Sequence, residues 1–369
     1  MSEGERIRVA ILFGGQSAEH EISILSARHV LAALDGSRFE PVLIGIDRTG
    51  RWLAQDTRKL LASGHDPRQV RIEEGTPVPM SSALRAAGVA GSGSRIDVVF
   101  PVLHGTLGED GAMQGLLEVA GIPYVGAGIL GSAIGMDKDV MKRLLRDAGI
   151  PVAEFRTLRR DSFDADPRGV CEELGVLGFP LFTKPANAGS SVGIRKVASA
   201  TALPAAIRYA FEFDSKVLVE AAVSGREIEL AVLGGSPPAV SVAGEIIVEH
   251  PDGFYSYEAK YIDEHGARLE LPARLSAGEL SRAQALALQT FEVLECEGMA
   301  RVDLFLTRDG RLLVNEINTI PGFTAISMYP KLWALSGIQP TELVGRLIEL
   351  ALARGRRRAA LRRSAFADR

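Results

Sequence analysis

Apolar runs typical of buried strands alternate with helical patterns in the first third of the chain. The first run covers residues 7–13 and leads through a glycine turn into a helical pattern over about 18–34, and a second run covers 41–46. A third run covers 97–103. Near-continuous apolar strands are typical of a parallel sheet that helices cover on both faces. The pattern predicts an N-terminal α/β domain, with Ser17 as a candidate cap of the first helix.

Shorter strand patterns mark the second half of the chain. They cover residues 179–184, 216–220 and 228–233. The strand that ends at Glu220 and the next one, which begins near Glu227, would connect two lobes through an interdomain hinge. An apolar helix over about 340–353 closes the chain, whereas residues 48–95 follow no regular period and are interpreted as an insertion.

The segment from Arg301 to Asn318 has the pattern of a β-hairpin around Asp309-Gly310. A two-residue loop would pair Asp303 with Glu316 and Arg301 with Asn318. It would also place Leu313 on the apolar face, and Leu312 and Val314 on the polar face. Facing like charges destabilise a sheet by about 0.2–1 kcal/mol. A divalent cation would remove that penalty, because two carboxylates and an amide oxygen suit Mg²⁺. The alternative is a surface patch in which Arg301 neutralises the two acids.

Composition narrows the classes of protein. The chain has 369 residues, of which 46% are hydrophobic and 24% charged, with a formal net charge of −4. This length allows two or three domains. The segment 354–369 contributes +6, so the rest carries −10, which argues against nucleic-acid binding. This basic tail is interpreted as a solvated helix end. Two distant cysteines favour a reducing compartment, and neither a signal peptide nor a membrane-spanning run is evident.

Polar loops that follow the predicted strands are candidate binding sites. Glu19 follows the first strand, and the glycine-rich loop 104–111 follows the third. Helix capping is the alternative for these acids, and a packed sheet-edge histidine for His104. Lys184 beside the Gly/Ser loop 189–193 suits a polyphosphate. Neither GxGxxG nor a Walker A motif occurs, which argues against a dehydrogenase. The polar and aromatic segment 250–265 is long enough to close over a site.

Eight motifs, in order, resemble those of the D-alanine–D-alanine ligases, a peptidoglycan-precursor family of the ATP-grasp superfamily. They are Ser17-Ala-Glu19-His-Glu-Ile-Ser, His104-Gly-Thr-Leu-Gly-Glu109-Asp110-Gly, Met136-Asp-Lys138, Lys184-Pro, Gly189-Ser-Ser-Val-Gly, Glu-Ala-Lys260-Tyr261, Arg301-Val-Asp303 and Asn315-Glu316-Ile-Asn318-Thr-Ile-Pro-Gly322. The resemblance implies an α/β ATP-grasp fold, with a Rossmann-like parallel-sheet domain at the N-terminus. Two α+β lobes would enclose the nucleotide. The expected domains are residues 1–126, 127–221 and 222–369.

The resemblance also implies roles for individual residues. The phosphates of ATP would be bound by Lys138, Lys184, Ser191 and Lys260. The adenine would be bound by Glu220 and Val223, and the ribose by Glu227. Asn315 would also contribute to the ATP site. Two Mg²⁺ ions, replaceable by Mn²⁺, would be bound by Asp303, Glu316 and Asn318. Glu19 would receive the ammonium group of the first D-alanine. Ser190 and Tyr261 would be linked to Glu19 through hydrogen bonds.

The remaining implied roles concern the acyl group and the second substrate. Arg301 and the Gly322 N–H would stabilise the tetrahedral oxyanion, so that Arg301 would point at the acyl carbon rather than at Asp303. Ser327 and the Met328 N–H would bind the second carboxylate.

The implied activity is ATP-dependent ligation of two D-alanines in the cytoplasm by a homodimer, through a D-alanyl phosphate. Two alternatives stay open within the family, a D-alanine–D-lactate and a D-alanine–D-serine ligase. A non-catalytic nucleotide-binding protein is the rival of another class. Such a protein should have lost some of the metal or oxyanion residues, and Arg301, Asp303, Glu316 and Asn318 are all present.

Overall fold

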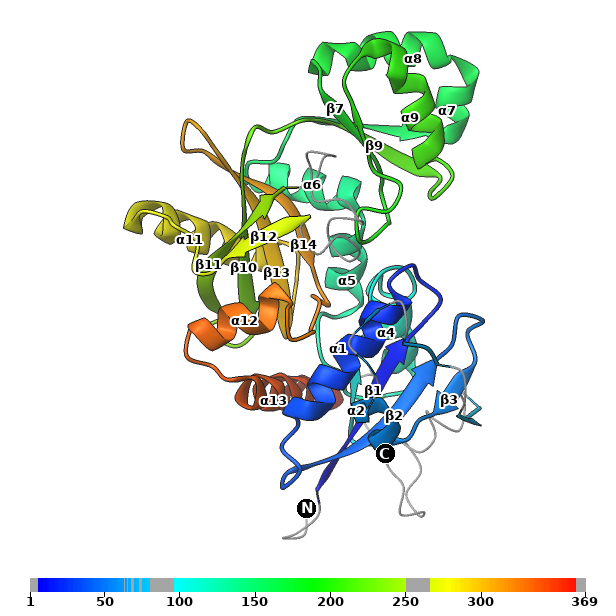
Figure 1. Ribbon diagram of the computed structural model, residues 1–369, viewed down its shortest axis with the longest axis vertical. Helices are drawn as coiled ribbons and strands as arrows, with labels where there is room; N and C mark the ends of the chain where they lie inside the picture. Colours follow the sequence, from blue (N-terminus) through cyan, green and yellow to red (C-terminus); the bar gives the residue numbers. More distant parts are fainter. Residues whose placement is uncertain are drawn as a thin grey trace.

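The computed structural model describes residues 6–62, 64, 66–67, 70–72, 75–79, 96–249 and 266–362. Over these residues the chain forms three sheets, stacked along the long axis of the molecule (Figure 1). The N-terminal sheet has the order β4-β3-β2-β1-β5, the central sheet β6-β9-β7-β8 and the C-terminal sheet β12-β11-β10-β13-β14. The mixed α/β architecture of the sequence prediction is confirmed.

The N-terminal sheet is built around β1, which pairs in parallel with both of its neighbours. The antiparallel strands β3 and β4 extend the sheet beyond β2. The bounds are β1 Ile7–Gly14, α1 His20–Ala33, β2 Phe39–Ile46, β3 Trp52–Ala54, α2 Thr57–Ala62, β4 Thr76–Pro77, β5 Val98–Pro101 and α4 Ala112–Val119.

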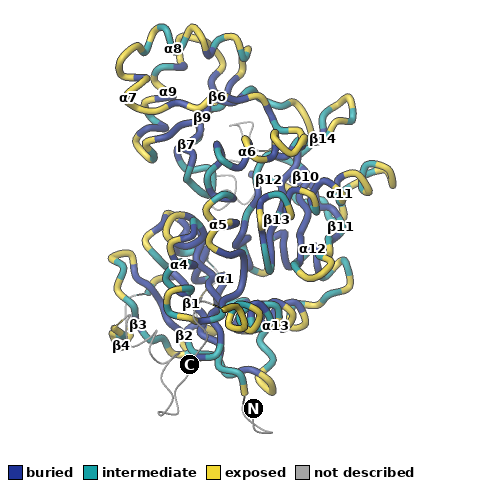
Figure 2. Tube along the Cα trace, turned by 180° about the vertical axis from the view of Figure 1, so that it is seen from behind, coloured by how far each residue is buried: buried dark blue, intermediate teal, exposed yellow. Residues whose placement is uncertain are grey.

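Both faces of β1 are buried, as its apolar run predicts (Figure 2). Val9, Ile11 and Phe13 point into a core shared with α1 and with α13 (Pro340–Ala359). Ala10 and Leu12 point into a separate core on the α4 side. The C-terminal helix therefore packs on the N-terminal sheet, far from its place in the sequence.

The central sheet is antiparallel and smaller. One of its faces packs on short helices around Phe163, Ile207 and Phe211. The bounds are β6 Phe155–Arg159, α7 Arg160–Ala165, α8 Pro167–Leu174, η1 Gly175–Leu177, β7 Leu181–Pro185, β8 Arg195–Val197, η2 Ala200–Ala202, α9 Leu203–Ala210 and β9 Lys216–Ala221.

The C-terminal sheet is also antiparallel, and α11 and α12 both pack against it. The strand β9 belongs to the central sheet and the next strand, β10, to the C-terminal sheet, so the chain crosses between lobes where the sequence predicts it. The bounds are β10 Gly225–Leu233, β11 Ala239–Val248, β12 Ala267–Glu270, α11 Ala277–Val293, β13 Met299–Thr307, β14 Leu312–Asn318 and α12 Met328–Leu335.

The hairpin β13–β14 has the predicted pairs but a different turn. Arg301 faces Asn318 and Asp303 faces Glu316, as predicted, whereas Leu304 faces Val314 and Leu306 faces Leu312. The predicted two-residue loop is therefore wrong, because the Thr307 N–H bonds the Arg311 carbonyl and leaves three residues in the turn. Gly310 adopts a φ of 80° there. A bulge at Asn315 then restores the register at the acids.

The bulge also changes which face of β14 carries its apolar residues. Val314 is fully buried and Leu312 packs against the same core, so both lie on the apolar face and not on the polar face as predicted. Leu313 is only partly buried and lies on the other face, which corrects its predicted position.

Helices α5 (Ile129–Met136) and α6 (Lys138–Asp147) lie between the sheets. Met141 and Leu145 of α6 are fully buried in the core of the C-terminal sheet. A Cβ at Gly135 of α5 would lie 2.9 Å from Thr319 Cγ2, so this close approach to the end of β14 requires glycine. The predicted domain boundaries stay a prediction, and α6 and α13 pack across them.

Two details differ from the sequence prediction. Glu19, and not Ser17, is the residue that precedes the first turn of α1; the Ser17 hydroxyl donates to the His104 carbonyl at 2.7 Å. Arg354, at the start of the basic tail, is buried and donates to the carbonyls of Tyr124 and Gly126, both at 2.6 Å. This part of the tail is therefore not solvated. Among the described residues, no helix is long and apolar enough to cross a membrane.

Candidate active site

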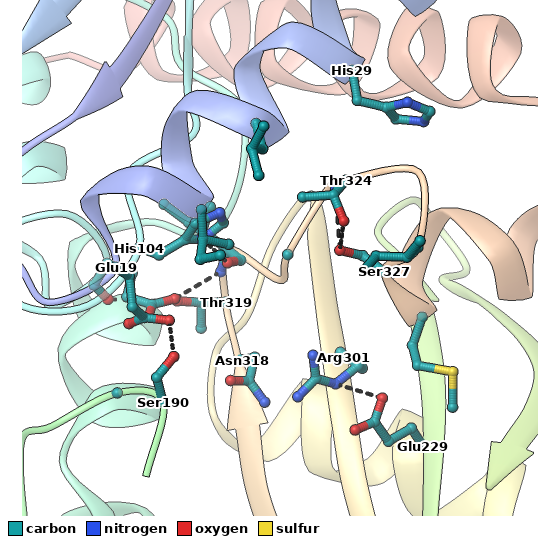
Figure 3. Close-up of a pocket in the computed structure, with 18 of the residues that line it drawn as sticks. Glu19, His29, His104, Ser190, Glu229, Arg301, Asn318, Thr319, Thr324 and Ser327 are labelled. Carbon is teal, nitrogen blue, oxygen red and sulfur yellow. Dashed lines mark hydrogen bonds and ion pairs between the residues drawn. The ribbon is translucent and has the colours of Figure 1, made fainter. Parts of the chain in front are cut away.

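A cavity of about 790 Å³ lies where α1, α5, the loop before β8 and the C-terminal sheet meet. It brings together residues that are far apart in the sequence (Figure 3). The predicted site residues on its lining are Glu19, Lys138, Ser190, Arg301, Glu316, Asn318, Gly322, Ser327 and Met328.

Glu19 is a buried carboxylate whose position is fixed from two sides. The Ser190 hydroxyl donates to Glu19 Oε1, which joins the first turn of α1 to the Gly/Ser loop (Figure 3). A Cβ at Gly105 or Gly189 would lie 2.8 or 2.4 Å from Glu19 Oε2, so both loops approach the carboxylate only because they carry glycine there. Ser190 adopts a φ of 48°, a strained conformation outside glycine. The acid is thus held by a neutral group and is open to a ligand cation.

His104 connects the N-terminal domain to the turn after β14. Its Nδ1 lies 3.0 Å from the Ile320 carbonyl and its Nε2 lies 3.1 Å from Ser26 Oγ. The same hydroxyl accepts the Phe323 N–H at 3.1 Å. Burial lowers the pKa of His104, so the ring is neutral, donates from Nδ1 and accepts at Nε2. This chain of bonds fixes the backbone on both sides of Gly322.

Glu109 is a second buried acid at this end of the cavity. It accepts the Gly105 N–H at 2.8 Å and the Ile320 N–H at 3.3 Å. Burial, and next the nearby Glu19 carboxylate, raise the pKa of Glu109 to about 8. Glu109 therefore stays protonated near neutral pH.

Three acids form a row across the C-terminal sheet. Glu229 on β10 pairs with Asp303 on β13, which pairs with Glu316 on β14. Arg301 lies among them: its Nε and Nη2 donate to Asp303 at 2.7 and 2.6 Å, and Nε lies 3.0 Å from Glu229 Oε2. Although burial opposes it, the carboxylates of Asp303 and Glu229 raise the pKa of Arg301, which stays charged. Arg301 thus pairs with Asp303, contrary to the orientation expected from the sequence.

The acid row and Asn318 are the candidate metal ligands. Among the residues described, no three His, Cys, Asp or Glu side chains are grouped so as to hold a metal ion by themselves. Asp303 and Glu316 are nevertheless the oxygen donors that Mg²⁺ takes when substrate phosphates complete its shell. The Asn318 amide donates to Asp303 Oδ2 at 3.0 Å, so its oxygen points elsewhere. These residues fit a metal ion that arrives with a nucleotide.

Lys138 lies at the first position of α6, on the cavity wall. Its Nζ donates to the Ala188 carbonyl at 2.7 Å and lies 4.0 Å from Glu316 Oε2. Asp137 caps the helix by accepting the N–H groups of Asp139 and Val140. A lysine beside a helix N-terminus and next to a glycine-rich loop is suited to bind an anion.

Lys184 and Glu220 form a second charged cluster, in the central sheet, with Lys142 of α6. Lys184 Nζ donates to Glu220 Oε1 at 2.7 Å, and Lys142 Nζ lies 2.8 Å from Oε2. Burial alone would raise the pKa of Glu220, but the two lysines outweigh it and hold that pKa at about 2. The carboxylate is therefore ionised at all working pH values.

Some predicted residues are not part of the cavity wall. Val223 lies in the connection between β9 and β10, Glu227 on β10, and Asn315 at the bulge of β14. Ser191 lies in the Gly/Ser loop with a φ of 59°. Lys260 and Tyr261, with the predicted closing loop 250–265, lie outside the described residues.

Sequence reasoning missed two charged residues of the site, Lys142 and Glu229. Lys142 follows Lys138 by four residues, so it lies on the same face of α6, and this spacing could have identified it. Glu229 is an acid inside the apolar run Ile228-Glu-Leu-Ala-Val, which is also a recognisable signal. For Glu109 and His104, the sequence favours capping and packing when each residue is taken singly, and only the density of polar groups around the glycines indicates a site.

Comparisons with known proteins agree with this geometry. Residues 8–127 match the family described as D-ala D-ala ligase N-terminus, and residues 144–349 match D-ala D-ala ligase C-terminus. D-alanine--D-alanine ligase A of Chromobacterium violaceum is 52% identical, over 97% of this chain and 99% of the relative. The protein of the same name from Escherichia coli K12 is 48% identical, over 95% and 97%.

Solved structures give the same result. The D-alanine-D-alanine ligase from Coxiella burnetii has a TM-score of 0.80 and 38% identity, over 96% of both chains. The VanG D-Ala:D-Ser ligase from Enterococcus faecalis has a TM-score of 0.81 and 38% identity, over 94% of this chain and all of the other. Family, fold and nearly complete coverage agree, and the chain therefore belongs to the D-alanine–D-alanine ligase family.

Proposed function

We propose that this protein joins two D-alanine molecules into D-alanyl-D-alanine, with ATP as the energy source, for the synthesis of peptidoglycan precursors. The observation that carries the proposal is the cavity itself. One end presents the Glu19 carboxylate held by a neutral hydroxyl, and the other presents Arg301, Lys138 and two acids of the row, Glu229 and Glu316. An amino acid needs both a partner for its ammonium group and partners for its carboxylate.

In the first step, a carboxylate oxygen of the first D-alanine attacks the γ-phosphorus of ATP. The bond from that phosphorus to the bridging oxygen breaks, and ADP leaves with its electron pair. Glu19 binds the ammonium group, and Ser190 and Tyr261 are linked to Glu19 through hydrogen bonds. Lys138, Lys184 and Ser191 hold the phosphates, and Lys260 approaches the transferred group. Two Mg²⁺ ions, held by Asp303, Glu316 and Asn318, would neutralise phosphoryl charge when bound, and Mn²⁺ could replace them.

In the second step, the amine of the second D-alanine attacks the carbonyl carbon of the D-alanyl phosphate. The carbon–oxygen bond to phosphate breaks, and the attacking nitrogen loses its proton. Ser327 and the Met328 N–H bind the second carboxylate. Arg301 and the Gly322 N–H stabilise the oxyanion, and the His104 hydrogen bonds keep the Gly322 turn in place.

The nucleotide would lie between the central and C-terminal sheets. Glu220 and Val223 would contact the adenine and Glu227 the ribose, and Asn315 belongs to the same binding set. The use of ATP places the proposed reaction in the cytoplasm. The homodimer expected from the family stays a prediction.

The test is phosphate release with D-alanine as the sole amino acid. We expect release that depends on D-alanine, ATP and Mg²⁺, together with formation of the dipeptide. L-alanine is the matched control and should give no release above background. Equal release with both enantiomers, or none with D-alanine, would refute the proposal.

A second candidate is D-alanyl-D-serine synthesis, because one solved structure of similar fold is named as a D-Ala:D-Ser ligase. The curated relatives at 48–52% identity are named as D-alanine--D-alanine ligases, which favours the first proposal. Mixtures of D-alanine with D-serine or D-lactate discriminate between the candidates. D-alanyl-D-alanine should be the main product when the two substrates are at equal concentrations. If D-alanyl-D-serine or D-alanyl-D-lactate were the main product, that alternative would be favoured.

A further inference from the structure

Lys142 is a buried cation that the proposed mechanism does not use. It projects from α6 toward the central sheet, where Glu220 on β9 lies between it and Lys184 on β7. The two lysines contact different oxygens of Glu220, Lys142 at 2.8 Å and Lys184 at 2.7 Å. One carboxylate therefore has two cationic partners, where one would already balance its charge.

The two lysines differ in how freely they can move. The Lys142 side chain is 1% exposed, and neighbouring Met141 and Leu145 anchor α6 in the core of the C-terminal sheet. The Lys184 side chain is 10% exposed and lies where β7 ends and the chain turns toward the Gly/Ser loop. Burial lowers the pKa of Lys142, although Glu220 opposes this shift. Burial therefore disfavours the charged form of Lys142, and the contact with Glu220 offsets part of that cost.

Under the proposed function, Lys184 exchanges one partner for another. Its Nζ donates to Glu220 in this structure and would donate to a phosphate oxygen of ATP. Glu220 is 2% exposed, so without Lys184 its carboxylate would lack both water and that counter-ion. Removing one partner from a buried ion pair is strongly unfavourable, because the other charge stays buried. The exchange therefore needs a second cation that stays.

We propose that Lys142 is a positioning residue that keeps Glu220 paired while Lys184 moves to a phosphate of ATP. This inference rests on the proposed function, which assigns Lys184 to the phosphates. Without Lys142, Lys184 would be the only cation left on Glu220 among the described residues, and it would stay there. ATP would then bind weakly, whereas a ligand without phosphates would not be affected.

The rival explanation is that Lys142 only ties α6 to the central sheet. Lys216 supplies a matched control for that role, because its ion pair with Asp139 also joins β9 to α6. Its Nζ lies 2.6 Å from Asp137 Oδ1 and 3.2 Å from Asp139 Oδ2, and it does not contact Glu220 among the described pairs. If Lys142 only links α6 to the central sheet, its loss should weaken the binding of all adenine ligands equally.

The experiment measures equilibrium dissociation constants for ATP with Mg²⁺, and for adenosine, in the absence of D-alanine. The variants are Lys142→Met, Lys216→Met, Glu220→Gln and the double variant Lys142→Met/Glu220→Gln. In Lys142→Met we expect the Kd for ATP to rise about tenfold or more, with the Kd for adenosine within about twofold. Lys216→Met should show no such selectivity.

The double variant tests whether Lys142 acts through Glu220. Once Glu220 is neutral, loss of Lys142 should no longer matter, so the double variant should bind ATP like Glu220→Gln within about twofold. Equal weakening of ATP and adenosine in Lys142→Met, or additive effects in the double variant, would overturn the inference. Lys142→Met should fold because Glu220 keeps Lys184; if it does not fold, Lys142→Gln takes its place in the single and the double variant, with the same expected results.

Lys184→Met separates this inference from the proposed function. If Lys184→Met binds ATP as tightly as the unaltered protein does, the proposed phosphate role of Lys184 is wrong. If Lys184→Met weakens ATP binding about tenfold or more and Lys142→Met does not, only the inference about Lys142 is wrong.

Discussion

The two ends of the cavity differ in how their charges are held. At the N-terminal end, Glu19 accepts from a hydroxyl, and its neighbours His104 and Glu109 are kept neutral by burial. At the C-terminal end, Arg301 is paired with Asp303 and Glu229, and Lys138 lies near Glu316. Among the described residues, the first end holds a carboxylate without an ion-pair partner in a fixed position, whereas the second holds charges that neutralise one another.

This difference indicates which end must rearrange. A fixed carboxylate whose described partner is a hydroxyl can receive an ammonium group without the breaking of an ion pair. At the paired end, a metal ion at Asp303 or an oxyanion at Arg301 would compete with the ion pair between them, and Glu229 is a further partner for Arg301. Substitutions at the two ends should therefore affect different kinetic constants.

The largest effect should come from Glu316→Gln at the paired end. Loss of this carboxylate removes a candidate metal ligand and a charge beside Lys138, so kcat should fall on the order of 10³-fold. The fold should be retained, because Glu316 is partly exposed and the apolar face of β14 is unchanged. Steady-state phosphate release across a Mg²⁺ titration measures this.

The matched control is Glu342→Gln, an exposed acid on α13 whose carboxylate pairs with Arg346. It should leave kcat within about twofold, because exposed pairs contribute little. If Glu316→Gln regained normal turnover at saturating Mg²⁺, the metal role of Glu316 would be lost.

A smaller and different effect is expected from Glu19→Gln at the neutral end. A hydrogen bond to a charged group is worth about 1.5–3 kcal/mol, so the KM for the first D-alanine should rise about 10- to 100-fold. The KM for ATP should change by no more than about twofold. Initial rates with each substrate varied in turn give both constants.

Glu21→Gln is a close control, because Glu21 lies on the same helical turn but is bound by Arg48, with both contacts at 2.7 Å. It should leave the KM for D-alanine unchanged. An equal rise in the KM for ATP in Glu19→Gln would mean that the substitution disturbs the whole cavity, and the contrast between the two ends would fail.

The fold follows from the sequence where local pattern is sufficient. The buried run 7–13 predicts β1, and residues 41–46 predict most of β2. The Asp309-Gly310 pair cannot distinguish a two-residue from a three-residue loop, because both place glycine at positive φ. The pairing of Asp303 with Glu316 survived this error only because the bulge at Asn315 compensates for the longer turn.

The site follows from the sequence less completely. The resemblance named the residues that would contact ligands, and the cavity gathers most of those that the structure describes. It did not name Lys142 and Glu229, which touch other side chains and depend on contacts between distant segments. Neither could local pattern place α13 on the N-terminal sheet, since its apolar face fits any core.

The smallest effect concerns stability and again distinguishes the two ends. The pKa of Glu109 is raised by burial and by Glu19 to about 8, from its ordinary value of 4.5. The folded protein therefore binds the proton more tightly than the unfolded chain does. The contribution of Glu109 to the free energy of unfolding is fully present below pH 4.5 and is lost as pH rises to about 8. The glutamine side chain in Glu109→Gln cannot ionise, so this variant should not lose stability in this way as pH rises.

Unfolding in denaturant at pH 5 and pH 8.5 measures the difference. Relative to the unaltered protein, Glu109→Gln should gain at least about 1.4 kcal/mol between the two pH values, the equivalent of one pKa unit. Glu342→Gln, whose carboxylate lies at the surface, should follow the unaltered protein at both pH values. A parallel pH dependence in Glu109→Gln would mean that Glu109 ionises as freely as a surface acid. The N-terminal end would then hold two negative charges, and its contrast with the paired end would no longer rest on one fixed carboxylate.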